Sequence, residues 1–341
     1  MNRKAGSPDP IVKHDTSPEP APVPNPPGPP SLPTPGRGRS NLRLRRTLDT
    51  LAEKGIFVVS LAAISIIFLI FVYVAREAWP LIRGQVEEAS ILSMFSRPYD
   101  WQPVSADPRF SVMPLLVGTF KVTFIGMLLA TPLALASALY TAEFAPPALK
   151  EWIKPVIELL AGIPSVVVGF FALIVLAPWM SQMFGIQLLN AFTAGIAMAL
   201  AVIPIIFTVT EDALSSVPAT YKEASLALGA SKVQTAVRVV LPAASPGIGA
   251  ALILGMGRAI GETMIVLMVL GNAGVMSLDP FSSARTISAT IAAEMGEVIF
   301  GGDHYRVLFF LGVLLFIITS GLNWIGDWVN SSLRRKLFGS S

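Results

Sequence analysis

The sequence predicts an all-α membrane protein with six transmembrane helices. Of its 341 residues, 53% are hydrophobic and only 14% are charged, and the mean hydropathy is +0.64. A soluble domain is less apolar and carries more charge than this. The apolar residues also gather in runs long enough to cross roughly 30 Å of hydrocarbon. We therefore expect a multi-pass protein in contact with membrane lipid.

Composition also excludes several function classes. Cysteine is absent, so no disulfide or thiolate metal site is predicted. His14 and His304 are the only histidines and no H-E-x-x-H motif occurs, which argues against a zinc membrane protease. No G-x-x-x-x-G-K-[ST] motif is present, so the chain is not expected to bind ATP through a phosphate-binding loop of this kind. We expect no catalytic residues, no cofactor, no metal and no nucleic-acid partner.

The N-terminal part divides into two segments before the first apolar run. Residues 1–40 form a Pro-rich segment that holds 12 of the 28 prolines, and such a composition predicts a disordered tail. Residues 41–55 form a basic juxtamembrane segment. No apolar run directly follows the basic start, so a cleaved secretory signal is not expected.

Residues 56–336 are predicted to form the six-helix transmembrane domain. An even number of spans puts both termini on one side, and the basic clusters 37–54 and 334–336 indicate that this side is the cytoplasm. Gly162-Ile163-Pro164-Ser165 predicts a helix break in the third span. A short helix is expected at 287–295, outside the spans. The six spans are expected at 56–79, 112–140, 153–178, 189–209, 243–271 and 307–329.

A lysine lies near the outer end of the second predicted span. Lys121 stands between Thr119 and Thr123 in an otherwise apolar run. A lysine there can extend its ammonium group to the headgroups. A cation that attracts an anion at a channel entrance is the alternative interpretation.

A polar loop separates the fourth and fifth predicted spans. Thr220-x-x-Glu223 and Ser231-x-x-Gln234 both fit a capping box. Gly229 follows a run of helix formers and suits a left-handed helix end. The second piece is expected to stop at Pro242. The pattern predicts two short helices with a bend at Gly229, and an ordinary interfacial loop is the alternative.

Two opposite charges lie inside the fifth predicted span. Arg258 is near the middle of the run 243–271, and Glu262 follows four residues later. A charge at the bilayer centre costs on the order of 3 kcal/mol, so it needs compensation. In a continuous helix the two side chains share one face. Three interpretations remain open from the residues: a structural ion pair, a substrate pathway and a scaffold for a proton relay.

The polar loop resembles the EAA loop of ABC importer permeases. Glu223-Ala224-Ser225 matches the Glu-Ala-Ala triplet except at its third residue, Gly229 matches the glycine, and Leu241-Pro242 matches the terminal pair. The resemblance implies the MetI-like fold of type I importers. It also implies a coupling loop over 220–242 that docks on a cytosolic ATPase, with hydrolysis in that separate chain.

Two further stretches are similar to the phosphate-specific (Pst) permeases, nearer to PstC than to PstA. They are GRAIGETMIVLMVLGN at 257–272 and LAGIPSVVVGFFAL at 160–173. The similarity covers 118–335. It implies a permease subunit of an inner-membrane phosphate importer, together with a PstA-like second permease, a PstB-like ATPase dimer and an extracytoplasmic phosphate-binding protein.

The same resemblance assigns roles to the charged pair. Residues matching Arg258 and Glu262 are implicated in phosphate movement, and Thr263 and Asn272 are polar candidates for the same route. Our hypothesis is that Glu262 neutralises Arg258 until substrate passes.

Three other functions stay open at this point. The first is the same transport machinery for another oxyanion, sulfate or molybdate. The second is a scaffold that signals phosphate status through the Pro-rich tail. A secondary transporter is the third, although such proteins normally show two related halves and the sequence shows no clear repeat.

Overall fold

A computed structural model describes residues 39–86, 89–96 and 100–338 of the chain. It divides into two compact units, Met1–Ile64 and Ser65–Ser341. Helix α1 (Arg39–Ile82) begins in the first unit and ends in the second. The tail predicted for residues 1–40 lies outside the described residues, apart from its last two, which begin α1.

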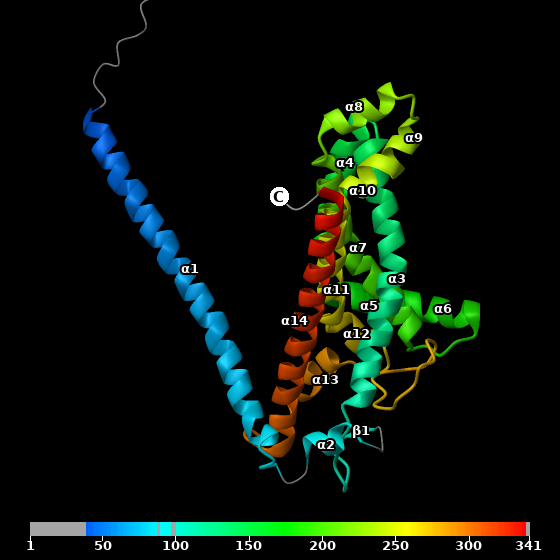
Figure 1. Cartoon of the computed structure of the whole chain (residues 1–341). Coiled ribbons are helices and arrows are strands. Elements are labelled where there is room, and N and C mark those ends of the chain that lie inside the picture. The colour runs from blue at the N-terminus through cyan, green and yellow to red at the C-terminus, as the bar shows by residue number, and fades with distance from the viewer. Residues whose placement is uncertain (1–38, 87–88, 97–99, 339–341) are drawn as a thin grey trace, which may run out of the picture. The chain divides into compact units, whose positions relative to one another are not determined.

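The described part of the chain is mostly helical, as predicted, and Figure 1 shows the elements in order. Its one sheet among the described residues is antiparallel and has two strands, β1 (Trp101–Gln102) and β2 (Arg109–Phe110), in which Trp101 faces Phe110. After α1 the α-helices are α2 (Ile91–Met94), α3 (Met113–Glu143), α4 (Pro147–Ala161), α5 (Ser165–Phe171), α6 (Ala177–Phe184), α7 (Ala191–Ser215), α8 (Ala219–Ala227), α9 (Lys232–Thr235), α10 (Leu241–Ala243), α11 (Ser245–Ile260), α12 (Met264–Val269), α13 (Ile287–Glu294) and α14 (Asp303–Phe338). Two π-helical turns, η1 (Ala172–Leu176) and η2 (Ala236–Val240), interrupt them.

Within the described residues, five helices are long and apolar enough to cross a membrane. A sixth span results if the pair Lys232–Ala243 and Ser245–Ile260, which bends by 68°, is counted as one. The predicted membrane class and the six-span architecture are therefore confirmed. The five single spans are Leu48–Ile82, Met113–Glu143, Ser165–Phe184, Ala191–Ser215 and Asp303–Ser332.

The third span begins later than predicted. The break at Gly162–Pro164 is confirmed, because α4 ends at Ala161 and Pro164 is extended (φ −58°, ψ 136°) before α5 starts. A proline disfavours helical geometry in the residue before it and cannot donate a backbone hydrogen bond. Residues 153–161 therefore belong to the separate amphipathic helix α4 and not to the spanning helix. The span itself runs through α5, η1 and α6.

The fifth span is not the continuous helix that was predicted over 243–271. Helix α11 ends at Ile260, three residues intervene, and α12 runs only from Met264 to Val269. The chain then turns through Gly271 (φ 89°) and Asn272 (φ 54°). The prediction failed because the one proline of this run, Pro246, lies at the start of α11, and no proline marks the break at 261–263.

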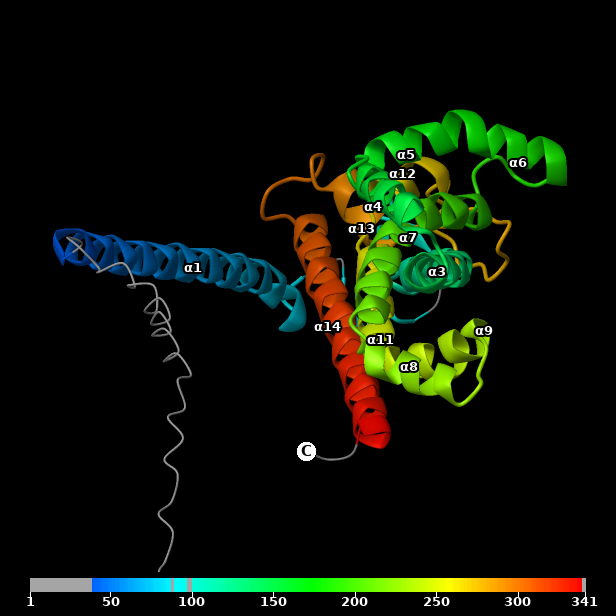
Figure 2. The ribbon, with the colours of Figure 1, turned by 90° about the horizontal axis from the view of Figure 1, so that it is seen from above.

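Helices α3 and α7 lie side by side (Figure 2), and small side chains let them approach closely. A Cβ atom on Gly126 of α3 would lie 3.1 Å from the sulfur of Met198, and a Cβ on Gly195 of α7 would collide with the side chain of Ile125. Alanines continue this contact on both helices, and small residues are what helix pairs in membranes use for close packing. The buried alanines are Ala130, Ala134 and Ala138 of α3 and Ala191, Ala194 and Ala197 of α7.

A second apolar cluster lies at the end of the larger unit opposite α8 and α9 (Figure 1). It joins the hairpin through Trp101 and Phe110 to the start of α3, to α13 through Ile287, and to α14 through Leu308. The rings of Trp101 and Phe110 meet edge to face at 5.7 Å. The cluster fixes the connections at this end of the bundle against the ends of three helices.

Candidate functional site

The loop between α7 and α11 folds as two short helices with a bend, as predicted. Helix α8 ends at Ala227, Gly229 adopts φ 84°, and α9 begins at Lys232. The capping box at Ser231 is confirmed: its hydroxyl accepts a bond from the Gln234 amide (3.2 Å), and its own amide donates to the Gln234 side chain (2.8 Å). Only glycine adopts this left-handed conformation without steric cost.

Two details of the loop differ from the prediction. Pro218 caps α8, and Thr220 lies inside its first turn without a side-chain capping bond, so the predicted Thr220–Glu223 capping box is wrong. The second piece also does not stop at Pro242, because η2 and α10 carry the chain through it to Ala243. Pro242 occupies the first turn of α10, where a missing backbone donor is tolerated.

The loop predicted to be the coupling loop, residues 220–242, exposes apolar side chains. Leu228 is 90% exposed, and Glu223, Ala224, Gly229 and Pro242 are exposed too, whereas Leu241 is half-buried. Exposed apolar residues that lie close together indicate an interaction surface. The other large exposed apolar residues here are Tyr221, Leu226, Val233 and Val237.

Polar contacts join this loop to α3, join its two helices to each other, and join the neighbouring helices α4 and α7. Lys222 of α8 forms an ion pair with Glu143, the last residue of α3, at 2.6 Å. Ser225 and Thr235 join α8 to α9 through their hydroxyls at 3.0 Å. In α4, Lys154 pairs with Asp212 and Glu211 of α7. Its hydrogen bond to Asp212 and the charge of Glu211 raise the pKa of Lys154, so it stays charged at neutral pH.

Arg258 and Glu262 meet at the break between α11 and α12. An Nη atom of Arg258 lies 3.6 Å from Oε2 of Glu262, which is longer than a hydrogen bond. Their exposures differ sharply, since the Arg258 side chain is 49% exposed and that of Glu262 only 4%. Arg258 lies in the last turn of α11 rather than in the middle of a span.

The buried carboxylate has a second role that the sequence did not reveal. Oε1 of Glu262 accepts bonds from the amides of Thr263 (3.1 Å), Met264 (3.2 Å) and Ile265 (3.4 Å). These are the amides that the start of α12 leaves unpaired. Glu262 thus lies in the break and caps α12. The predicted proximity of Arg258 and Glu262 is confirmed, but the continuous helix that was expected to carry both is not. Backbone donors, in addition to Arg258, compensate its charge.

The other two candidate residues lie at opposite ends of α12. The Thr263 hydroxyl donates to the carbonyl of Gly261 (3.2 Å), beside Arg258 and Glu262. Asn272 lies beyond the other end, where its amide donates to the carbonyl of Leu267 (2.8 Å). The structure therefore brings Arg258, Glu262 and Thr263 together and leaves Asn272 apart from them.

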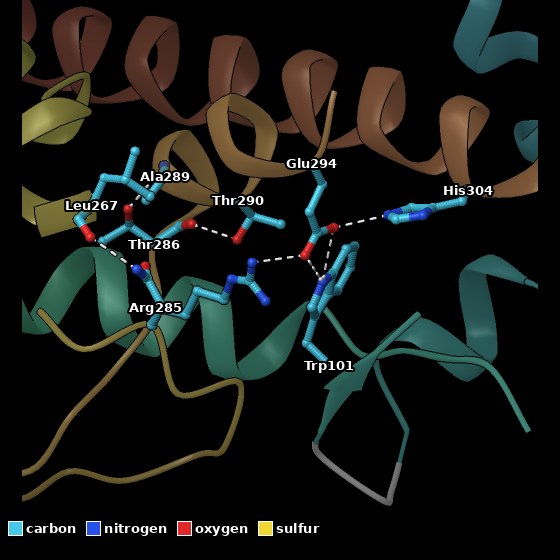
Figure 3. A network of polar contacts seen from close by, with 9 residues as sticks. Trp101, Leu267, Arg285, Thr286, Ala289, Thr290, Glu294 and His304 are labelled. Atoms are coloured by element: carbon cyan, nitrogen blue, oxygen red, sulfur yellow. Dashed lines mark hydrogen bonds and ion pairs between the residues drawn. The ribbon is translucent and has the colours of Figure 1, made fainter. Parts of the chain in front are cut away.

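A polar network that the sequence did not predict lies on the hairpin side of α13 (Figure 3). The carboxylate of Glu294 accepts bonds from Trp101 Nε1 (3.0 Å) and pairs with Arg285 (2.7 Å) and His304 (2.8 Å). Its members come from β1, α13, α14 and the segment before α13. Their wide separation in sequence hid the network, and the charged residues between the fifth and sixth predicted spans were the signal that the sequence offered.

Lys121 of α3 contacts the segment between α12 and α13. Its ammonium group donates to the carbonyls of Ser277 and Asp279 (both 3.0 Å) and to the hydroxyl of Ser282 (3.1 Å). Lys121 therefore fixes the segment between α12 and α13 to α3.

The chain resembles known transport proteins in sequence and in fold. Residues 130–338 match the family described as binding-protein-dependent transport system inner membrane component. Among curated relatives, the probable ABC transporter permease protein YqgH of Bacillus subtilis is 38% identical over 226 residues, 66% of this chain and 73% of that protein. A chain in the structure of a bacterial alginate ABC transporter shares the fold, with a TM-score of 0.57 at 14% identity, over 87% of this chain and 99% of that chain.

The chain therefore belongs to the binding-protein-dependent inner membrane transport components, a class of ABC permease chains. Within this family it is similar to the phosphate transport system permease protein PstC of Mesorhizobium japonicum. The two are 35% identical over 273 residues, which is 74% of this chain and 82% of that protein. PstC of Pasteurella multocida is 33% identical over 279 residues, 74% of this chain and 85% of its own length.

Proposed function

We propose that this chain is the permease subunit of an ATP-driven importer of inorganic phosphate in the inner membrane. The similarity to PstC permeases over about three quarters of the chain carries this proposal. Arg258, at the break between α11 and α12, supports a phosphate substrate on chemical grounds, because a guanidinium can donate two parallel hydrogen bonds to two oxygens of one phosphate.

The chain works with partners that supply the energy and deliver the substrate. They are a PstA-like second permease, a PstB-like ATPase dimer that hydrolyses ATP, and an extracytoplasmic phosphate-binding protein. The exposed apolar residues of the coupling loop suit an ATPase surface. The half-exposed Arg258 suits a pathway whose other wall comes from the second permease.

Both termini lie in the cytoplasm in this proposal. The basic clusters 37–54 and 334–336 flank the first and last spans, and cytoplasmic flanks are rich in lysine and arginine. The coupling loop lies on the same side, and the β1–β2 hairpin and the Glu294 network lie at the outer surface.

Arg258 is the residue that binds the passing anion. Its guanidinium has five N–H donors, and its one ion pair among the described residues, to Glu262, is a loose one at 3.6 Å. Glu262 is held by three backbone amides, so it stays in place when Arg258 turns away. This modifies the hypothesis from sequence: Arg258 moves towards phosphate, and Glu262 keeps α12 formed and draws Arg258 back afterwards.

Uptake of labelled phosphate and labelled sulfate tests the substrate. Cells that lack the gene are complemented with the wild-type chain or with an empty vector. We expect the wild type to restore phosphate uptake and to leave sulfate uptake at the vector level. Restored sulfate uptake without phosphate uptake would contradict the substrate and leave the transport architecture standing.

A further inference from the structure

Helix α3 connects the two ends of the larger unit without interruption. It runs from Met113 to Glu143, 31 residues, which corresponds to about 45 Å at 1.5 Å per residue. Pro132 lies inside it and does not end it. Figure 1 shows α3 extending from the hairpin end to the coupling loop. A helix that packs closely along its length transmits a displacement at one end to the other.

At its inner end, α3 is joined to the coupling loop by a partly buried ion pair. Glu143 Oε1 lies 2.6 Å from the Lys222 ammonium group, and the two side chains are 12% and 27% exposed. Lys150 of α4, outside the loop, donates to the Ala142 carbonyl at 2.8 Å and so binds the same end of α3. Cations are favourable at a helix C-terminus, where the carbonyls are unpaired. Water screens an exposed ion pair more strongly than this one.

At its outer end, α3 holds the segment between α12 and α13. The Thr119 hydroxyl accepts a bond from the Ile287 amide, the first residue of α13, at 3.1 Å. Gly118 lets the Arg285 backbone approach so closely that any Cβ would collide with its carbonyl. Lys121 donates to the Ser277 and Asp279 carbonyls. Residues 118–121 of α3 therefore hold this segment at two places, at 277–279 and at 285–287.

Helix α13 carries the connection on to the Arg258–Glu262 site. The Ser288 hydroxyl, in its first turn, donates to the backbone carbonyl of Glu262 at 2.7 Å. Ser288 and Glu262 are 6% and 5% exposed, so water does not compete for this bond. The other end of α13 is held by Glu294, which binds Trp101 and His304 (Figure 3). A shift of α13 therefore acts on the Glu262 backbone.

We infer that α3 is a lever between the ATPase-docking loop and the Arg258–Glu262 site, and that Lys222–Glu143 is its inner joint. The inference rests on the proposed function. When the loop moves with the ATPase, Lys222 moves Glu143 and α3 follows as one body. Thr119 and α13 then displace the Glu262 backbone relative to Arg258. Lys222 and Glu143 act as positioning residues, because neither touches the substrate.

Charge reversal and exchange test the joint. The complete transporter, with its second permease, ATPase and binding protein, is reconstituted in proteoliposomes, and phosphate uptake and ATP hydrolysis are measured together. Glu143→Lys and Lys222→Glu alone should each lower the phosphate moved per ATP by about tenfold, within the range usual for coupling between sites. The exchanged double variant should recover most of this ratio. If the exchanged double variant moved as little phosphate per ATP as either single variant, the Lys222–Glu143 pair would not be the joint.

Two controls separate coupling from assembly and from the choice of substrate. The amount of ATPase that copurifies with each variant should match wild type, because a merely structural pair would lower that amount and not the ratio. Lys154→Glu breaks the ion pairs of Lys154 with Glu211 and Asp212, which do not involve α3, and should leave the ratio nearly unchanged. If wild type moved sulfate instead of phosphate, the substrate proposal would fail, but the ratio per anion would still test the lever.

A double-mutant cycle tests whether the two ends of α3 act together. Thr119 and Glu143 lie about 36 Å apart along the helix, and changes at such distances normally act independently. Glu143→Gln removes the charge at the joint with little change of shape, and Thr119→Val removes the acceptor of the Ile287 amide. We expect the double variant to be no worse coupled than the worse single variant. If the double variant lost coupling by the product of the two single losses, the two ends of α3 would act independently and the lever would be refuted.

Discussion

The capping role of Glu262 predicts that two substitutions at this position differ in stability. Glu262→Ala leaves the amides of Thr263, Met264 and Ile265 without their acceptor. Loss of an N-terminal cap costs about 0.5–2 kcal/mol, and buried donors left unpaired cost about 1–3 kcal/mol. We therefore expect a loss of roughly 2–4 kcal/mol in the free energy of unfolding.

Glu262→Gln keeps an oxygen at the same place and removes only the charge. Bonds to a charged acceptor are roughly twice as strong as neutral ones. The glutamine variant should therefore lose about 1 kcal/mol, clearly less than the alanine variant.

Thermal unfolding of the purified chain in detergent measures this difference. The expected order of midpoints is wild type, then Glu262→Gln, then Glu262→Ala. Glu223→Ala is the control, because Glu223 is exposed in the coupling loop and should unfold like wild type. Equal midpoints for wild type and both variants would refute the cap. A glutamine variant as unstable as the alanine variant would show that the ion pair with Arg258 matters more than the amides.

Three further substitutions test other parts of the structure. In Gly229→Trp the tryptophan must adopt a left-handed conformation, which costs about 1–2 kcal/mol, and its side chain enters open space on the proposed coupling loop. ATP hydrolysis by the complex should then no longer drive uptake, and unchanged coupling would count against a docking role for this loop. Ser231→Ala removes the capping box of α9 and should cost about 1 kcal/mol in unfolding experiments, whereas an unchanged midpoint would mean that the loop does not depend on it. Lys121→Met removes three bonds to the segment between α12 and α13, and limited proteolysis there should become faster; wild-type resistance would contradict the anchoring role.

The length of an apolar run predicted most of the fold, because the membrane fixes how long a spanning helix must be. The second, fourth and sixth spans fall close to α3, α7 and α14. The break at Gly162–Pro164 was predictable because proline acts through the backbone of its immediate neighbours. The bend at Gly229 was predictable for a similar reason, since it needs a local conformation that glycine favours.

The break at Glu262 was not predictable from the same rules. Nothing in Gly261-Glu262-Thr263 prevents a helix, and the spacing of Arg258 and Glu262 suits a continuous one. The helix restarts because a buried carboxylate satisfies three amides, and its burial depends on tertiary packing. The Glu294 network was hidden for another reason, since Trp101, Glu294 and His304 come together only in the folded chain.

Arg258 is the residue on which the proposed transport route depends most directly. The decisive measurement is the initial rate of labelled phosphate uptake by the reconstituted transporter with wild-type, Arg258→Ala or Arg109→Ala chains. Arg109 is a matched control, because its side chain is 43% exposed and paired with Asp100, but it lies on the hairpin. We expect Arg258→Ala to lose most of the uptake while Arg109→Ala keeps the wild-type rate. Equal rates for all three chains would contradict the account and leave Arg258 as a structural residue.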